Sequence, residues 1–204
     1  MYQKTSLYLL LTVFLFLITG TAFAQQEKHL LLGTDFQFKG KWFTEVNKEG
    51  ISGSILRFFE GELDSTSDAL TVMSIGKAGR YTIWIRTPDF ETSPRTRLFQ
   101  LSVGNIKLKK AGGHGKPGYA WERLGHANLK DSEVLLRLHN FNFGRCDAIL
   151  LTQDSTVNPN NLVKKTLLSW KKHPATAEVF TDEKKNTTPS LQLGHTDKVI
   201  AGIE

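Results

Sequence analysis

The chain has 204 residues, of which 26 are Lys or Arg and 20 are Asp or Glu, so its formal net charge is +6. A single cysteine excludes a disulfide-stapled scaffold and a zinc site built from several thiolates. The 40% hydrophobic and 23% charged content is typical of a packed protein, and the length accommodates one main domain. The modest positive charge demands no polyanion, so we expect no nucleic-acid partner.

Residues 1–24 have the three parts of a secretory signal peptide. Lys4 provides a basic start, Leu7–Ile18 is apolar at all but one position, and Ala22-Phe23-Ala24 forms a small-x-small cleavage site. The apolar run is shorter than the about 20 residues that a membrane-spanning helix needs. No cysteine follows it, which excludes a lipoprotein anchor. We therefore expect a cleaved signal and a secreted or periplasmic protein without a membrane span.

Residues 25–154 predict an all-β domain. Short apolar stretches with period-two alternation are separated by Gly, Pro, Asp or Asn at regular intervals. Seven of them are expected to be strands: Ser54–Glu60, Ala69–Ile75, Arg80–Thr87, Arg97–Val103, Ala120–Leu124, Glu133–His139 and Cys146–Thr152. In Arg80–Thr87 both faces carry bulky side chains, so one face is expected against a core and the other under a loop or a ligand. Many short strands without a long helix between them indicate an antiparallel β-sandwich.

The pattern changes after Asp154. Asn158-Pro159 is typical of a helix start. Apolar residues then recur at helical spacing opposite lysines: Leu162, Val163, Leu167 and Trp170. We expect one amphipathic helix over residues 155–173 that docks on the sandwich, and the alternative is a basic helix on a membrane surface. Residues 174–204 are polar and are interpreted as a flexible tail or a truncated linker.

Motifs of catalytic and metal sites are not apparent. The sequence has no G-x-S-x-G elbow, no H-E-x-x-H and no His pair at metal-ligand spacing. The stretch Gly112-Gly113-His114-Gly115-Lys116 lacks the frame of a phosphate-binding loop and is interpreted as a surface loop. Cys146 is interpreted as a small buried hydrophobe, with a reactive thiol as the alternative. We expect no catalytic residue and no enzymatic activity.

One group of residues is typical of sugar recognition. Aromatic rings stack on the C–H-rich faces of sugars, and Asn or Arg side chains hydrogen-bond the hydroxyls. The domain contains several aromatic residues, and an Asn-rich loop over residues 140–145 precedes its last strand. The candidate carbohydrate-binding residues are Trp42, Tyr119, Trp121, Asn140, Asn142 and Arg145. In the alternative, a purely structural sandwich, Trp42, Tyr119 and Trp121 would all be buried.

Three segments carry a family resemblance. Residues 78–86 (AGRYTIWIR) are similar to the A-G-x-Y-x-v-w-v-R strand of galactose-binding-like jelly-roll modules, such as the family 6 and family 35 carbohydrate-binding modules. The segment from Trp121 to Leu138 resembles a pair of their strands, and Arg145–Thr152 resembles their closing strand. The resemblance covers residues 36–154. It implies a non-catalytic, exported module that binds a polysaccharide or glycan, with Asp147 near the sugar-binding end or a structural calcium site.

The resemblance also leaves alternatives open. Calcium-binding members usually carry acidic ligands in their first strand, whereas the corresponding residues 36–42 contain none. We therefore expect no cofactor, with a structural calcium ion as the alternative. In bacteria such modules are often fused to glycoside hydrolases, polysaccharide lyases or flavin-dependent oxidoreductases. The chain would then be the accessory N-terminal domain of a larger secreted enzyme, with a catalytic domain in a neighbouring reading frame. A structural or interaction sandwich without a ligand is the remaining hypothesis.

Overall fold

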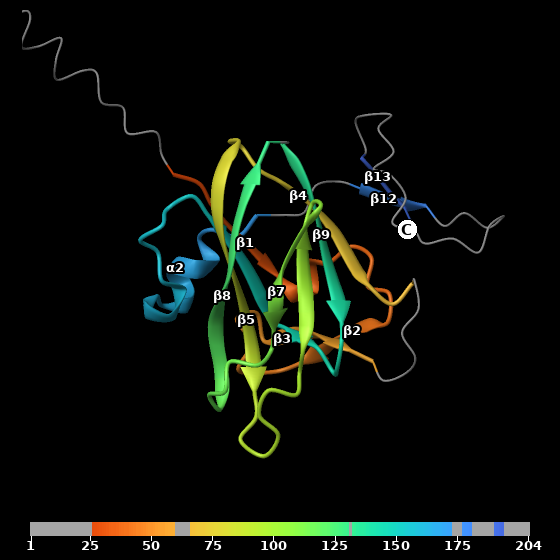
Figure 1. Ribbon diagram of the computed structural model, residues 1–204, viewed down its shortest axis with the longest axis vertical. Coiled ribbons are helices and arrows are strands. Elements are labelled where there is room, and N and C mark those ends of the chain that lie inside the picture. Colours follow the sequence, from red (N-terminus) through yellow and green to blue (C-terminus); the bar gives the residue numbers. More distant parts are fainter. Residues whose placement is uncertain (1–25, 60–65, 131, 173–176, 181–189, 194–204) are drawn as a thin grey trace, which may run out of the picture.

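The computed structural model describes residues 26–59, 66–130, 132–172, 177–180 and 190–193 (Figure 1). The predicted signal peptide, residues 1–24, lies outside these ranges. Most of the described chain is in β-strands, which pair in antiparallel fashion. In these ranges no helix has the length and apolar character needed to cross a bilayer.

Two four-stranded sheets form the body. The first sheet consists, in spatial order, of β1 (Lys28–Leu32), β11 (Ala148–Thr152), β5 (Gly79–Asp89) and β8 (Gly118–Leu129). The second sheet consists of β4 (Ala69–Ser74), β9 (Glu133–Asn140), β6 (Phe99–Val103) and β7 (Ile106–Ala111). A smaller sheet contains β10 (Arg145–Cys146), β3 (Ser54–Phe58) and β2 (Trp42–Val46). A 3-10 turn, η1 (Gly33–Asp35), follows β1, and β12 (Ala177–Phe180) pairs with β13 (Ser190–Leu193).

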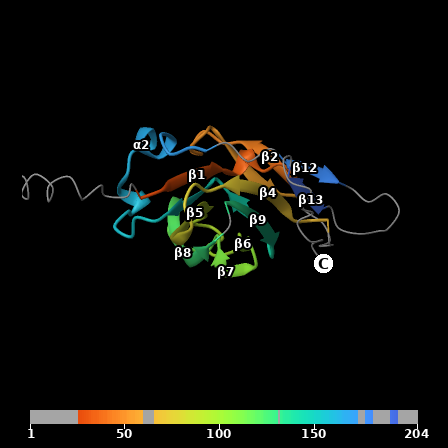
Figure 2. The same cartoon turned by 90° about the horizontal axis from the view of Figure 1, so that it is seen from above.

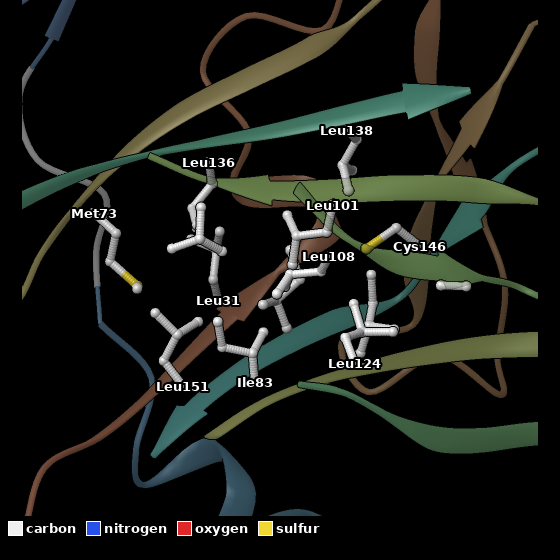
Figure 3. Close-up of a cluster of buried hydrophobic side chains, with 14 of the residues drawn as sticks. Leu31, Met73, Ile83, Leu101, Leu108, Leu124, Leu136, Leu138, Cys146 and Leu151 are labelled. Carbon is white, nitrogen blue, oxygen red and sulfur yellow. The ribbon is translucent and has the colours of Figure 1, made fainter. Parts of the chain in front are cut away.

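The first and second sheets face each other across the hydrophobic core (Figure 3). The side chains that meet between them are Leu31, Ile83, Leu124 and Leu151 from the first sheet and Met73, Leu101, Leu108, Leu136 and Leu138 from the second. Along β9 every second residue is buried, because successive side chains of a strand point to opposite faces. This arrangement is the antiparallel sandwich that the alternating sequence predicts. Cys146 lies in the same core, where burial raises the pKa of its thiol, as expected for a buried hydrophobe.

The outer face of the first sheet is covered by the C-terminal segment, residues 155–172. A second apolar cluster combines Leu30, Leu32, Ile51, Trp121, Ala148, Leu150 and Leu167. Trp84, on the outer face of β5, packs against this cluster, which explains the bulk on both faces of that strand. Two backbone hydrogen bonds join the segment to Leu30 of β1, from the Leu30 N–H to Trp170 (2.8 Å) and from the Lys172 N–H to Leu30 (3.1 Å). In Figure 2, α2 (Lys164–Leu168) and strands β6 and β7 lie on opposite sides of β1.

The C-terminal segment is less helical than the sequence predicts. The single helix expected over residues 155–173 is replaced by a 3-10 turn, η2 (Pro159–Asn161), and the five-residue helix α2. The Asn158 side chain caps the turn by accepting a hydrogen bond from the Asn160 N–H (3.1 Å), but Leu162 and Val163 then adopt extended conformations. A helix this short is unstable alone, so docking on the sheet sets the conformation. Of the predicted tail, residues 174–204, only β12 and β13 are described, and both are strands.

All seven predicted strands are present, with two changes. The strand expected at Ala120–Leu124 extends over Gly118–Leu129, and the one expected at Cys146–Thr152 is divided at Asp147, where the chain passes from the smaller sheet to the first sheet. Strands β1, β2, β7, β12 and β13 were not predicted. In β7 lysines occupy three of the six positions and break the period-two pattern.

Asn160 attaches the C-terminal segment to the edge strand β8. Its side chain accepts a hydrogen bond from the Trp121 N–H (2.9 Å) and donates one to the Trp121 carbonyl oxygen (3.1 Å). We predict that Asn160→Ala lowers the free energy of unfolding by about 1–3 kcal/mol and accelerates hydrogen exchange at the Trp121 amide. The exposed neighbour Asn161 provides the matched control, and Asn161→Ala should change neither quantity. Equal Trp121 exchange rates in the two variants would contradict this role.

Candidate functional site

Two adjoining hollows lie where β5 ends and β8 begins. The larger, about 590 Å³, is lined by the β2–β3 loop (Asn47, Lys48, Glu49), by Pro88–Glu91 and by Pro117–Tyr119. The smaller, about 280 Å³, lies between the same loop and the C-terminal segment. Since Lys48, Glu49 and Tyr119 line both, the two hollows form one groove, which we call the loop-end groove.

Tyr119 lies where the two hollows of the loop-end groove meet. Pairing of β5 with β8 sets Tyr119 opposite Pro88 and Trp121 opposite Arg86. The Arg86 guanidinium lies over the Tyr119 ring, with 4.5 Å between its Cζ and the ring centroid, and this cation–π contact holds the ring in place. The Tyr119 hydroxyl is buried and has no hydrogen-bond partner in the described part of the protein. Burial raises the pKa of Tyr119 to about 12, with Asp147 adding to the shift.

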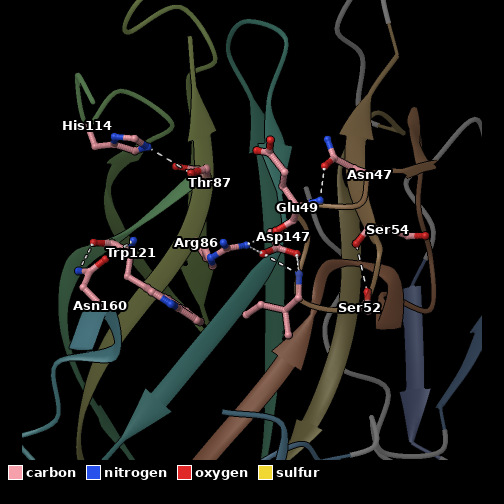
Figure 4. Close-up of polar contacts among 11 residues, drawn as sticks. Asn47, Glu49, Ser52, Ser54, Arg86, Thr87, His114, Trp121, Asp147 and Asn160 are labelled. Carbon is pink, nitrogen blue, oxygen red and sulfur yellow. Dashed lines mark hydrogen bonds and ion pairs between the residues drawn. The ribbon is translucent and has the colours of Figure 1, made fainter. Parts of the chain in front are cut away.

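A buried ion pair supports the wall of the groove (Figure 4). Arg86 donates a hydrogen bond to the Asp147 carboxylate and another to the Glu49 carbonyl oxygen (3.1 Å). Asp147 is fully buried and also accepts a hydrogen bond from the Ile51 N–H (3.0 Å). Burial raises the pKa of Asp147, while Arg86 and the Ile51 N–H oppose the shift. Asp147 and Arg86 therefore join β5 to the β2–β3 loop behind the groove.

A second carboxylate, Asp89, fixes two loops at the same end. Its oxygens accept hydrogen bonds from the backbone N–H groups of Phe90 (2.9 Å), Arg95 (2.9 Å) and Gly115 (2.7 Å). Burial acts to raise the pKa of Asp89, but the three N–H groups outweigh it and the pKa is lowered. The loops β5–β6 and β7–β8 are thus held together at the edge of the groove. The glycine-rich stretch predicted to be a surface loop belongs to the second of them.

The carboxylates near the groove do not gather into a metal site. Glu122, like Asp89 and Asp147, is engaged inside the protein, where it accepts hydrogen bonds from the Thr87 hydroxyl (2.7 Å) and the Gly112 N–H (2.8 Å). No group of three or more His, Cys, Asp or Glu side chains that could hold a metal ion occurs in the described ranges.

Three of the six predicted site residues, Trp42, Trp121 and Asn140, are buried. Trp42 is 3% exposed, with its ring packed edge-on against Phe58 and Phe99 at centroid distances of 5.4 and 5.6 Å. Trp121 is 7% exposed in the cluster beneath the C-terminal segment. Asn140 is also buried, and its side chain accepts a hydrogen bond from the Gly144 N–H (2.7 Å). Stacking on a sugar requires an open ring face; Trp42 lines neither hollow, whereas Trp121 lines the smaller hollow although little of it is exposed.

The other three predicted residues remain accessible. Tyr119 is half-buried in the groove, and Asn142 is exposed in the β9–β10 loop, where its N–H bonds to the Leu98 carbonyl oxygen (2.9 Å). Arg145 is half-buried, and its Cζ lies 4.8 Å from the ring centroid of Phe90, which lines the groove. The structure therefore brings Arg145 and Tyr119 to the same end of the sandwich, while Asn142 does not line the groove.

Two residues of this end, Phe90 and Arg97, were missed by the sequence analysis. Both belong to the β5–β6 loop, whereas the sequence pattern predicted Arg97 as the start of the strand Arg97–Val103 and placed Phe90 in no element. The spacing of these loop residues in the sequence does not show that they lie near Arg145 and Tyr119. That proximity depends on the order in which the strands pair in the sheets.

Solved structures with a similar fold include carbohydrate-binding modules. The family 35 module from Clostridium thermocellum matches with a TM-score of 0.48 and 14% identity over 60% of this chain and 96% of that chain. The GH26-CBM35 β-(1,4)-mannanase from Podospora anserina matches with a TM-score of 0.53 and 12% identity over 66% of this chain. The family 6 module of a laminarinase from Zobellia galactanivorans matches with a TM-score of 0.46 and 11% identity over 62% of this chain and 100% of that chain.

The chain has the jelly-roll fold of carbohydrate-binding modules. This confirms the fold predicted from the strand pattern and from the resemblance of residues 36–154. The chain spans 29% of the length of the mannanase that it matches. No family model and no curated protein matches the amino-acid sequence.

We predict that Asp89→Asn lowers the free energy of unfolding at neutral pH by about 1–3 kcal/mol, because an amide accepts hydrogen bonds more weakly than a carboxylate. The folded-state pKa of Asp89 lies below its unfolded value of about 3.9. Its stabilisation is therefore complete above the unfolded pKa and is lost as the pH falls through the folded-state pKa. The difference in free energy of unfolding between the wild type and Asp89→Asn, measured by urea unfolding from pH 7 to pH 3, should therefore become smaller at low pH. Glu91→Gln, at an exposed position, is the control, and a gap independent of pH would refute the role of charge.

Proposed function

We propose that this protein is a non-catalytic, exported carbohydrate-binding module that holds a glycan in the loop-end groove. The observation that carries the proposal is Tyr119, an aromatic ring fixed by Arg86 at the junction of two hollows. Its buried hydroxyl has no partner in the described chain, and such a group is costly unless a ligand or solvent satisfies it. The jelly-roll fold supports the same function, since the similar structures include carbohydrate-binding modules.

The groove has the size and chemistry that a sugar requires. Its larger hollow, about 590 Å³, falls within the about 300–1,000 Å³ typical of ligand sites. The side chains of Asn47, Lys48, Glu49 and Glu91 offer hydrogen-bonding groups around the aromatic rings of Phe90 and Tyr119. An open groove buries few groups per sugar, so we expect weak affinity for a single site.

The absence of catalysis is part of the proposal. The carboxylates Asp89, Glu122 and Asp147 are each engaged by internal hydrogen-bond donors, and they position loops and strands. The module would act alone or beside a catalytic domain, as the name of the GH26-CBM35 mannanase indicates for that protein. A ligand-free structural sandwich is the competing function, and it is favoured by the burial of Trp42 and Trp121. The half-exposed Tyr119 in the groove supports the binding module over the structural sandwich.

The proposal predicts that Tyr119→Ala weakens glycan binding by about tenfold or more, because the stacking surface is lost. Binding is measured by glycan array and by affinity electrophoresis in gels containing plant, algal or bacterial polysaccharides. Ile106→Ala removes an exposed apolar side chain at the β6–β7 turn, at the other end of the sandwich, and should bind as wild type. Asn142→Ala tests the predicted contribution of the β9–β10 loop. Full binding by Tyr119→Ala would rule out the groove as the binding site, and absence of all binding would favour the structural sandwich.

A further inference from the structure

Three arginines gather beside the loop-end groove, and we call them the arginine cluster: Arg57, Arg97 and Arg145. Antiparallel pairing of β10 with β3 places Arg145 directly opposite Arg57. Arg97, in the β5–β6 loop, and Arg145 both lie against the ring of Phe90, with Cζ-to-centroid distances of 5.1 and 4.8 Å. Phe90 in turn lines the groove, so the cluster adjoins the proposed glycan site.

The charge of the arginine cluster is only partly neutralised within the described chain. Arg57 forms an ion pair with Glu45 (2.7 Å). Arg97 donates to the uncharged hydroxyls of Thr96 (2.9 Å) and Ser93 (3.5 Å), whereas the side chain of Arg145 forms no hydrogen bond or ion pair with any described residue. The Nε atoms of all three arginines are buried and lack a hydrogen-bond partner in the same ranges. The cluster therefore retains N–H donors without a partner and a net positive charge.

Arg145 experiences this excess of positive charge directly. Burial lowers the pKa of Arg145, Arg57 and Arg97 lower it further, and Glu45 and Tyr119 act in the opposite direction. A partly desolvated guanidinium of this kind favours an oxyanion, because two parallel N–H groups satisfy two oxygens in one bidentate contact. Arg145 is also half-exposed, so a ligand can reach it.

An exposed aromatic ring lies next to the cluster. Phe143 is 38% exposed, and the guanidinium of Arg97 lies 5.4 Å from its ring centroid. Its φ of 46° falls in the left-handed region, which is unusual for a bulky residue and marks a backbone held by its surroundings. The next residue, Gly144, is required there because a Cβ would lie 2.7 Å from the Trp42 ring. The loop thus presents an apolar ring beside unpaired guanidinium groups.

We infer that the arginine cluster binds the oxyanion of an acidic sugar, either the carboxylate of a uronic acid or a sulfate ester, in a glycan that occupies the loop-end groove. The inference rests on the proposed function and names its substrate class. Phe143 and Tyr119 supply apolar contacts to the sugar rings, and Arg97 and Arg145 supply the charge-assisted hydrogen bonds. The net charge of +6 is spread over the whole chain, so local recognition has to be separated from general attraction.

Two matched pairs of polymers test the inference by isothermal titration calorimetry: polygalacturonate against its methyl ester, and dextran sulfate against dextran. We expect the protein to bind one charged polymer at least about tenfold more tightly than its neutral partner. The pair that shows the difference identifies the carboxylate or the sulfate. Arg145→Gln should weaken this binding about ten- to a hundredfold. Arg145→Lys keeps the charge but loses the bidentate geometry of the guanidinium, so it should weaken the binding less.

The matched control is Arg80→Gln, which makes the same change in net charge at the exposed start of β5, the opposite end of the strand from Asp89. It should bind as wild type, and circular dichroism checks that every variant is folded. Equal losses in Arg80→Gln and Arg145→Gln would overturn the inference, because net charge would then suffice. Neutral and charged polymers bound equally, with loss in Tyr119→Ala alone, would overturn it and leave the proposed function intact. Failure of both charged polymers to bind would overturn it as well.

Discussion

The five side chains of β11 are all buried, so the first sheet needs an apolar cover on each of its two faces. The second sheet supplies one cover and the C-terminal segment supplies the other. Burial of apolar surface is the dominant favourable term in folding, so a sheet of this composition is stable only with both covers in place. The C-terminal segment lies across the strands of this sheet and contributes Leu167 to the second apolar cluster. Its conformation, a short helix α2 between extended residues, follows from that position.

The extent of that second cover decides which aromatic side chains are open to a ligand. Trp121 and Tyr119 lie two residues apart on β8 and therefore share a face of the sheet. Asn160 attaches the C-terminal segment at Trp121, which is buried under it. Tyr119, one step nearer the end of the sandwich, is half-buried and lines both hollows of the groove, whereas Trp121 lines only the smaller one. The edge of the hydrophobic cover thus coincides with the groove.

At this end of the sandwich the carboxylates lie deeper than the guanidinium groups. The carboxylates of Asp89 and Asp147 are buried and engaged by backbone N–H groups or by Arg86, and they hold the loops around the groove in one arrangement. The guanidinium groups of Arg97 and Arg145 are nearer the surface and stack on Phe90, and neither has a carboxylate partner among the residues that the structure describes. In the proposed function, loops fixed in advance would lower the entropy cost of binding, and the arginines would supply the interaction energy. Different residues would then hold the groove in shape and contact the glycan.

The sequence by itself determined seven of the strands, the sandwich and the capped start of the C-terminal segment, because alternation along a strand and the Asn158-Pro159 pair are local signals. It also indicated the fold through the pattern of residues 78–86 and identified Tyr119 and Arg145 as candidates. It did not separate them from Trp42, Trp121 and Asn140, because periodicity tells which residues share a face and not what covers that face. The meeting of Arg57, Arg97 and Arg145 around Phe90 was likewise decided only by the tertiary structure, since it depends on the order in which distant strands pair.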